Sequence, residues 1–150
     1  MSVMTFNGLP LHPLVVHLTV VTLPVLVILA LLSLHPKFRD KLRWPLAVLA
    51  VFAFVLTWFT ASTGENLRDH FVNVLHVPLK TYAAHADAAD RLKLAAFALA
   101  AVIGVRFLLH NRGGVIRWAL AVLMVVAAGA VSYYVYKTGD TGARLVYSGV

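Results

Sequence analysis

The sequence predicts an all-α integral membrane protein, a four-helix bundle that forms a single domain over residues 1–150. Two observations support this class. The chain is 61% hydrophobic and only 13% charged, whereas an ordinary soluble domain carries about 25% charged residues. Four apolar stretches, long enough for helices that cross about 30 Å of hydrocarbon, alternate with polar connections. We therefore expect the lipid bilayer to be the main partner of the chain.

The first two expected spans cover about residues 13–34 and 44–63. The first contains no charged residue, and Pro13 suits its first turn, where a missing N–H costs no hydrogen bond. We expect the second to end at Thr63-Gly64-Glu65, because glycine commonly ends a helix. Residues 66–79 are too short and too charged to span, but their apolar side chains recur at helical spacing. They predict a short amphipathic helix at the membrane interface.

The last two expected spans cover about residues 80–110 and 114–137. The third carries charged residues in its first part, so only residues 94–105 form an uncharged apolar core. The fourth begins after two glycines and contains small residues at 127–130. Small residues allow two helices to approach closely in a membrane.

The distribution of basic residues predicts the orientation of the bundle. Four spans place both termini on one side. The two connections on the other side and their flanks hold seven basic residues and one acid, Asp40; the basic residues are Lys37, Arg39, Lys41, Arg43, Arg106, Arg112 and Arg117. The termini side holds six basic and five acidic residues. Because short basic loops stay in the cytoplasm, we expect both termini to lie outside. The net charge of +7 then reflects orientation, and no nucleic-acid motif is present.

Histidines and acids concentrate on the expected outer side. There are no cysteines, which excludes disulfides and thiolate metal sites. Five of the seven histidines and five of the six acids belong to this side; they are His12, His17, His70, His76, His85, Glu65, Asp69, Asp87, Asp90 and Asp140. Neutral imidazole binds haem iron, zinc or copper, and carboxylates add hard oxygen ligands. The side therefore contains the residue types of a cofactor or metal site.

A short internal repeat relates the two halves of the chain. Thr63-Gly64-Glu65 and Thr138-Gly139-Asp140 each follow an aromatic-rich helix end. Gly64 lies 52 residues after His12, and Gly139 lies 54 residues after His85. The spacing suggests two parallel helix-pair repeats around an axis along the membrane normal. It predicts that the two histidines lie at the same level, near the acids.

One set of motifs covers nearly the whole chain: residues 8–17 with their His-Pro-x-x-x-His segment, Thr63-Gly64-Glu65, the His85 region, and the closing Gly139-x-x-Gly-Ala-x-x-Val-Tyr147. With these motifs the chain resembles the bacterial four-helix membrane family catalogued as domain of unknown function 2231, which implies a location in the bacterial inner membrane. Members are often encoded with, or fused to, Rieske iron–sulfur domains, which implies a redox partner. Many members have histidine where this chain has Asp140, which implies a changed or lost ligand here.

Three hypotheses for function follow. In the first, haem b binds between His17 and His85 for electron transfer, with His12 as the substitute for either ligand. Because five residues turn a helix by about 140°, His12 and His17 cannot both face one ligand. In the second, zinc or copper binds to His12, His85, Glu65 and Asp140.

In the third hypothesis the protein is a non-catalytic subunit that packs against a larger respiratory complex through its small residues. Assembly into a homo-oligomer also stays open. The sequence contains no nucleophile triad, phosphate-binding glycine loop or zinc-protease motif. It therefore leaves open whether the protein catalyses any reaction.

Overall fold

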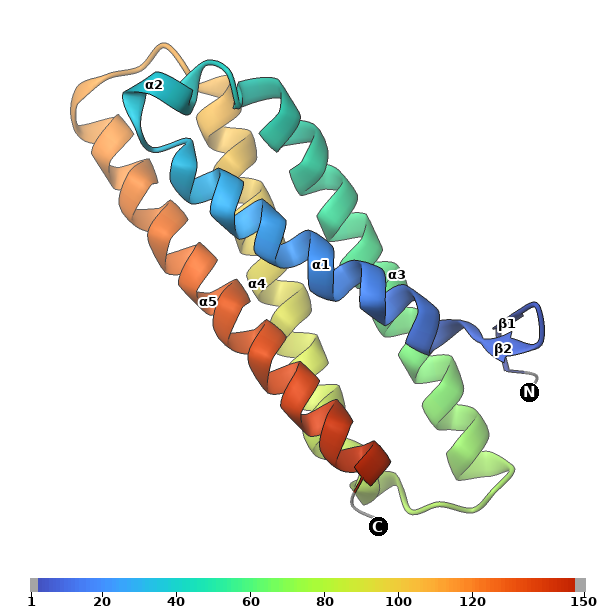
Figure 1. Cartoon of the computed structure of the whole chain (residues 1–150). Helices are drawn as coiled ribbons and strands as arrows, with labels where there is room; N and C mark the ends of the chain where they lie inside the picture. The colour runs from blue at the N-terminus through green and yellow to red at the C-terminus, as the bar shows by residue number, and fades with distance from the viewer. Residues whose placement is uncertain (1–2, 148–150) are drawn as a thin grey trace.

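Four long helices form an antiparallel bundle in the computed structural model, which describes residues 3–147 (Figure 1). They are α1 (Leu11–Leu32), α3 (Arg43–Asn73), α4 (Ala83–Leu108) and α5 (Gly114–Tyr147). Because neighbours in sequence run in opposite directions, the start of α1 and the end of α5 lie at the same end of the bundle. The all-α prediction is confirmed.

Alanine and leucine side chains fill the centre of the bundle. Each helix contributes small residues to this core, such as Ala53 from α3, Ala96 from α4 and Ala128 from α5. The side chains on the outer faces are also largely apolar, for example Val51, which is 65% exposed. A bundle that is apolar both inside and outside matches a lipid environment.

Three of the long helices, α1, α3 and α5, are long and apolar enough to cross a membrane. α4 packs against α3 and α5, but Arg91, Lys93 and Arg106 interrupt its apolar stretch. The prediction that α4 also crosses the membrane therefore rests on its packing against α3 and α5 as well as on its composition.

Short elements connect the long helices. Strands β1 (Thr5–Phe6) and β2 (Leu9–Pro10) form an antiparallel hairpin that the sequence did not predict. Its turn contains Asn7 and Gly8, both with positive φ, as two-residue hairpin turns favour. Met4 N–H donates to the Asn66 side-chain oxygen over 2.9 Å, which ties the segment before α1 to α3. Two more elements, α2 (Pro36–Arg39) and the 3₁₀ turn η1 (Leu79–Thr81), lie in the connections.

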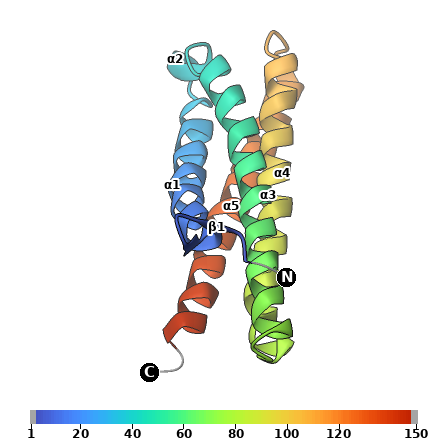
Figure 2. The same cartoon turned by 90° about the vertical axis from the view of Figure 1, so that its right-hand side faces the viewer.

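Two predicted helix ends are wrong. α3 does not stop at Thr63-Gly64-Glu65 but continues to Asn73, so it extends past the start of α1 (Figure 2). Residues 66–73 belong to this helix and do not form a separate interfacial one. α5 likewise continues beyond residue 137 to Tyr147. The helices therefore continue through glycines in both places, of which Gly64 and Gly142 pack closely against other side chains.

Candidate functional site

His12 lies in the first turn of α1 and reaches across to α3. Its Nδ1 lies 3.1 Å from the Thr60 carbonyl oxygen and 3.2 Å from the Thr63 hydroxyl oxygen. A carbonyl oxygen only accepts hydrogen bonds, so the Nδ1–H of His12 donates to Thr60. In the neutral ring this tautomer leaves Nε2 with a free lone pair.

His85 repeats this arrangement in the second half of the chain. It lies in the first turn of α4, and its Nδ1 lies 3.1 Å from the Thr138 carbonyl oxygen and 3.2 Å from the Thr141 hydroxyl oxygen. The same argument places the proton on Nδ1 and the lone pair on Nε2. Both rings are half-buried.

A glycine lies against each ring. A Cβ added at Gly64 would be 2.8 Å from Cε1 of His12, and one at Gly142 would be 3.1 Å from Cε1 of His85. A larger residue at either position would push against the imidazole. Each histidine therefore packs on the same motif of the facing helix, Thr-x-x-Thr-Gly, at residues 60–64 and 138–142.

This motif corrects the predicted register of the internal repeat. The partner of Thr63-Gly64-Glu65 is Thr141-Gly142-Ala143, three residues after the predicted one. A Cβ at Gly139 would have no atom within 4 Å, so Gly139 does not play the part of Gly64. The histidine contacts of the two halves match, but the spacing from His85 to the matching Gly142 is 57 residues, not the 54 to Gly139 that the sequence predicted.

The two imidazole rings meet inside the end of the bundle where α1 begins. Their centroids lie 6.4 Å apart and their planes cross at 79°. A metal-binding histidine usually donates its other ring N–H to a carbonyl or carboxylate, which fixes the ring and raises its basicity. Both histidines have this support, and both keep Nε2 for a ligand. The prediction that His12 and His85 lie at one level agrees with this contact.

His17 lies on the exposed side of α1 and does not join the pair. Its Nδ1 is 2.6 Å from the Pro13 carbonyl oxygen of its own helix. The angular separation of His12 and His17 along the helix explains why only one of them faces inwards. The structure brings together His12 and His85, where the leading sequence hypothesis had paired His17 with His85.

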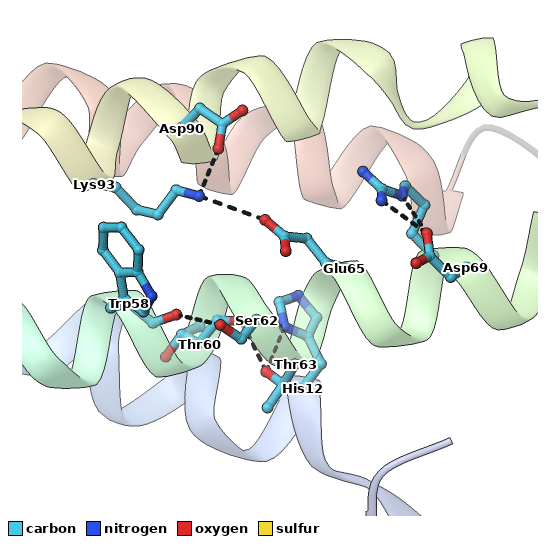
Figure 3. Close-up of polar contacts among 10 residues, drawn as sticks. His12, Trp58, Thr60, Ser62, Thr63, Glu65, Asp69, Asp90 and Lys93 are labelled. Carbon is cyan, nitrogen blue, oxygen red and sulfur yellow. Dashed lines mark hydrogen bonds and ion pairs between the residues drawn. The ribbon is translucent and has the colours of Figure 1, made fainter. Parts of the chain in front are cut away.

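Neither predicted carboxylate ligand joins the histidine pair. Glu65 pairs with Lys93 of α4 over 3.5 Å, and Lys93 also contacts Asp90 over 2.7 Å (Figure 3). Asp140 pairs with Arg144 one turn along α5, over 2.9 Å. Between residues 3 and 147, no group of three or more His, Cys, Asp or Glu side chains could hold a metal ion.

Threonine hydroxyls continue the polar region from the histidines into the bundle. The Thr19 and Thr60 hydroxyl oxygens lie 2.7 Å apart between α1 and α3, and both residues are buried. The hydroxyl of Thr138, the residue whose carbonyl oxygen accepts from His85, is buried without a hydrogen-bond partner. Sequence reasoning missed these threonines as site residues. One signal could have found them. The motif Thr-x-x-Thr-Gly occurs twice, each time in the long helix that follows a helix with a histidine in its first turn.

A family model with the description "Predicted membrane protein (DUF2231)" matches residues 8–150. The chain belongs to this family. The match includes both histidines of the pair and both Thr-x-x-Thr-Gly motifs, and it confirms the resemblance found in the sequence. Neither a curated protein nor a solved structure matches the chain. The family description supports a membrane protein and assigns no activity.

Proposed function

We propose that His12 and His85 bind one haem b through their Nε2 atoms and that the protein transfers electrons at the outer face of the bacterial inner membrane. One observation carries the proposal: the two imidazoles meet with both Nδ1–H groups bound to backbone carbonyls. Haem would supply one-electron redox chemistry at this position. The protein would supply the two axial ligands, their orientation and their tautomers.

The donor set favours haem over a bare metal ion. Zinc in proteins almost always has four ligands, or three and a water. The histidine pair supplies only two nitrogens, and the carboxylates of Glu65 and Asp140 are paired with Lys93 and Arg144. Haem iron needs only two axial ligands, since the porphyrin supplies the other four. Two imidazoles therefore complete haem but not zinc.

The separation of the rings also agrees with one shared metal atom. Metal–nitrogen bonds to histidine are about 2.0–2.1 Å long, and half the width of an imidazole ring adds about 1 Å more on each side. Two rings on opposite sides of one atom would then have centroids about 6 Å apart, close to the 6.4 Å between His12 and His85, provided that both Nε2 atoms turn towards that atom. Copper held by the two nitrogens alone fits the same separation and is the second candidate.

The position of the pair suits exchange with a partner protein. Both histidines lie within the first turn of their helices, and the rings are half-buried. With the expected orientation, this end faces the outer side, where the resemblance to the family implies a Rieske-type redox partner. A cofactor at the end of the bundle would lie near the membrane surface, within reach of such a partner.

The test is an absorption spectrum and a metal analysis of one purified sample, from cells supplied with haem precursor. We expect a Soret band at one haem per chain. His12→Ala and His85→Ala should each lose it, while His17→Ala, the matched control on the exposed side of α1, should keep it. Copper or zinc at one ion per chain, lost in the same two variants, would show that the histidine pair binds a metal ion and not haem. A sample with neither would leave the non-catalytic subunit as the function.

A further inference from the structure

Five arginines converge at the end of the bundle opposite the histidine pair. They line a cavity of about 40 Å³ between α3, α4, α5 and the α1–α3 connection, well above the roughly 10–15 Å³ that one water needs. We name it the arginine pocket after the arginines that line it, Arg39, Arg43, Arg106, Arg112 and Arg117. Several of the sequence positions that predict the cytoplasmic side are therefore also parts of one site.

No carboxylate lines the arginine pocket among the described residues. Asp40, the one acid in this part of the chain, contacts Arg39 and His110 over 3.2 Å each. A concave surface with several positive charges and apolar walls concentrates the field and attracts anions. The pocket therefore has an unbalanced positive charge that a bound anion would neutralise.

Arg43 and Arg106 are held in place by the backbone of neighbouring helices. Arg43 Nη2 donates to the Phe107 carbonyl over 3.1 Å, and its guanidinium lies 4.5 Å from the centre of the Phe107 ring. Arg106 Nη2 donates to the Ser33 carbonyl over 3.3 Å. Arginines that mark orientation alone would extend towards water, whereas these two are fixed between helices.

One donor in the pocket has no partner. Arg43 Nε is buried and makes no hydrogen bond. Leaving a buried donor unpaired destabilises a protein, and a charged donor does so more strongly. An acceptor bound in the pocket would satisfy this nitrogen once the Arg43 side chain turns it towards the cavity, because the atom itself is buried. The unpaired donor is a second indication of a ligand, independent of the charge count.

We propose that the arginine pocket binds a phosphate group, from the headgroup of an anionic phospholipid or from free phosphate. The arginine fork matches phosphate oxygens in two-point hydrogen bonds, and basic pockets between membrane helices bind anionic headgroups. Apolar residues line the pocket beside the arginines, including Leu46, Ile103 and Met124. A phospholipid presents a phosphate beside apolar groups, so this lining favours the lipid source.

The experiment measures thermal unfolding of the full chain in nanodiscs of neutral phosphatidylcholine, with and without phosphatidylglycerol. We expect the anionic lipid to raise Tm by about 5 °C. Arg43→Gln with Arg106→Gln should lose most of this rise. Arg112→Gln with Arg117→Gln, two exposed rim positions, should weaken it without disturbing the core. Lys37→Gln with Lys41→Gln removes the same charge outside the pocket and should keep it.

A second arm titrates inorganic phosphate into the neutral nanodiscs, against chloride at equal ionic strength. A rise in Tm with phosphate that the same arginine variants remove would assign the site to free phosphate. An equal response of all variants to anionic lipid would show only surface charge and would overturn the proposal. No response to either probe would overturn it as well.

Discussion

Thr63 and Thr141 occupy equivalent positions beside the two histidines. The Thr63 hydroxyl oxygen lies 3.2 Å from Nδ1 of His12, and the Thr141 hydroxyl oxygen lies 3.2 Å from Nδ1 of His85. The bundle therefore contains two copies of one histidine–threonine contact, one in the pair α1 and α3 and one in the pair α4 and α5. The copies bring their histidines into contact with each other, so a ligand between the rings would have equivalent supports on both sides.

Removing one threonine hydroxyl should weaken the ligand without removing it. Thr63→Val and Thr141→Val keep the volume but delete the hydroxyl beside Nδ1. Because outer-shell partners of metal-bound histidines typically change affinity by about 10–100-fold, each variant should lower haem affinity by about tenfold. Haem titration followed at the Soret band measures this. Ser62→Ala is the control, since the Ser62 hydroxyl donates to the Trp58 carbonyl of its own helix. Unchanged affinity in both threonine variants would contradict the role of the hydroxyls.

Gly64→Ala should affect the ligand much more than the fold. The new methyl group would meet the far end of the His12 side chain at 2.8 Å, and the ring can move away. Lost hydrogen bonds cost about 0.5–1.5 kcal/mol each, and replacing glycine by alanine within a helix returns about 1 kcal/mol. We expect unfolding free energy to change by about 1 kcal/mol or less, while haem binding is lost.

Gly139→Ala is the matched control for this substitution. It lies in the same kind of helix, and a Cβ there meets nothing within 4 Å. It should keep haem and gain up to about 1 kcal/mol of stability. Equal haem loss in Gly64→Ala and Gly139→Ala would show that helix flexibility, not the close approach of His12, matters at these glycines.

The apolar stretches and the residue types near their ends made much of the bundle predictable. They gave four helices, and they placed His12 and His85 at one end. The end of α3 was wrong because a glycine that makes room for an imidazole ring cannot be told, from the sequence, from one that ends a helix. Only the packing of Gly64 against His12 distinguishes the two. The expected fourth span stopped at residue 137, and α5 instead continues through Gly139 and Gly142 to Tyr147.

The partners of the histidines were less predictable. Thr60 is 48 residues from His12, and Thr138 is 53 residues from His85, so these contacts depend on how two helices are aligned along their length. The expectation that Asp140 is a metal ligand overlooked a neighbour on its own helix. Asp140 has Arg144 four residues along its own helix, and this pairing competes with any ligand role.

Removing the acids should therefore leave the ligand bound. Glu65→Gln breaks the contact with Lys93, and an ion pair that is half exposed contributes about 0.2–1 kcal/mol. Asp140→Asn breaks only the exposed contact with Arg144. Both variants should keep the Soret band or metal content of the unaltered protein. Loss of bound metal in both would restore the four-ligand zinc or copper site.

The buried hydroxyl contact between Thr19 and Thr60 should stabilise the packing of α1 on α3. Thr19→Val deletes one side of the 2.7 Å contact, and hydrogen bonds between membrane helices contribute about 0.6–2 kcal/mol. We expect a loss of that size in unfolding free energy, measured by denaturant titration in detergent. Thr57→Val is the control, because the Thr57 hydroxyl bonds to Ala53 of its own helix. A larger loss in Thr57→Val would contradict the prediction.

The crossing by α4 can be tested by cysteine labelling, because the chain has no cysteine of its own. Lys37→Cys, Asn73→Cys and Asn111→Cys place one thiol in, or at the helix end before, each connection, all at exposed positions. Short basic loops predict the cytoplasmic side for Lys37 and Asn111. A maleimide that cannot cross membranes should then label Asn73→Cys in intact spheroplasts and the other two only after permeabilisation. If α4 did not cross, Asn73→Cys and Asn111→Cys would label alike. The histidine pair and the arginine pocket would then no longer face opposite sides of the membrane, although both contact α4.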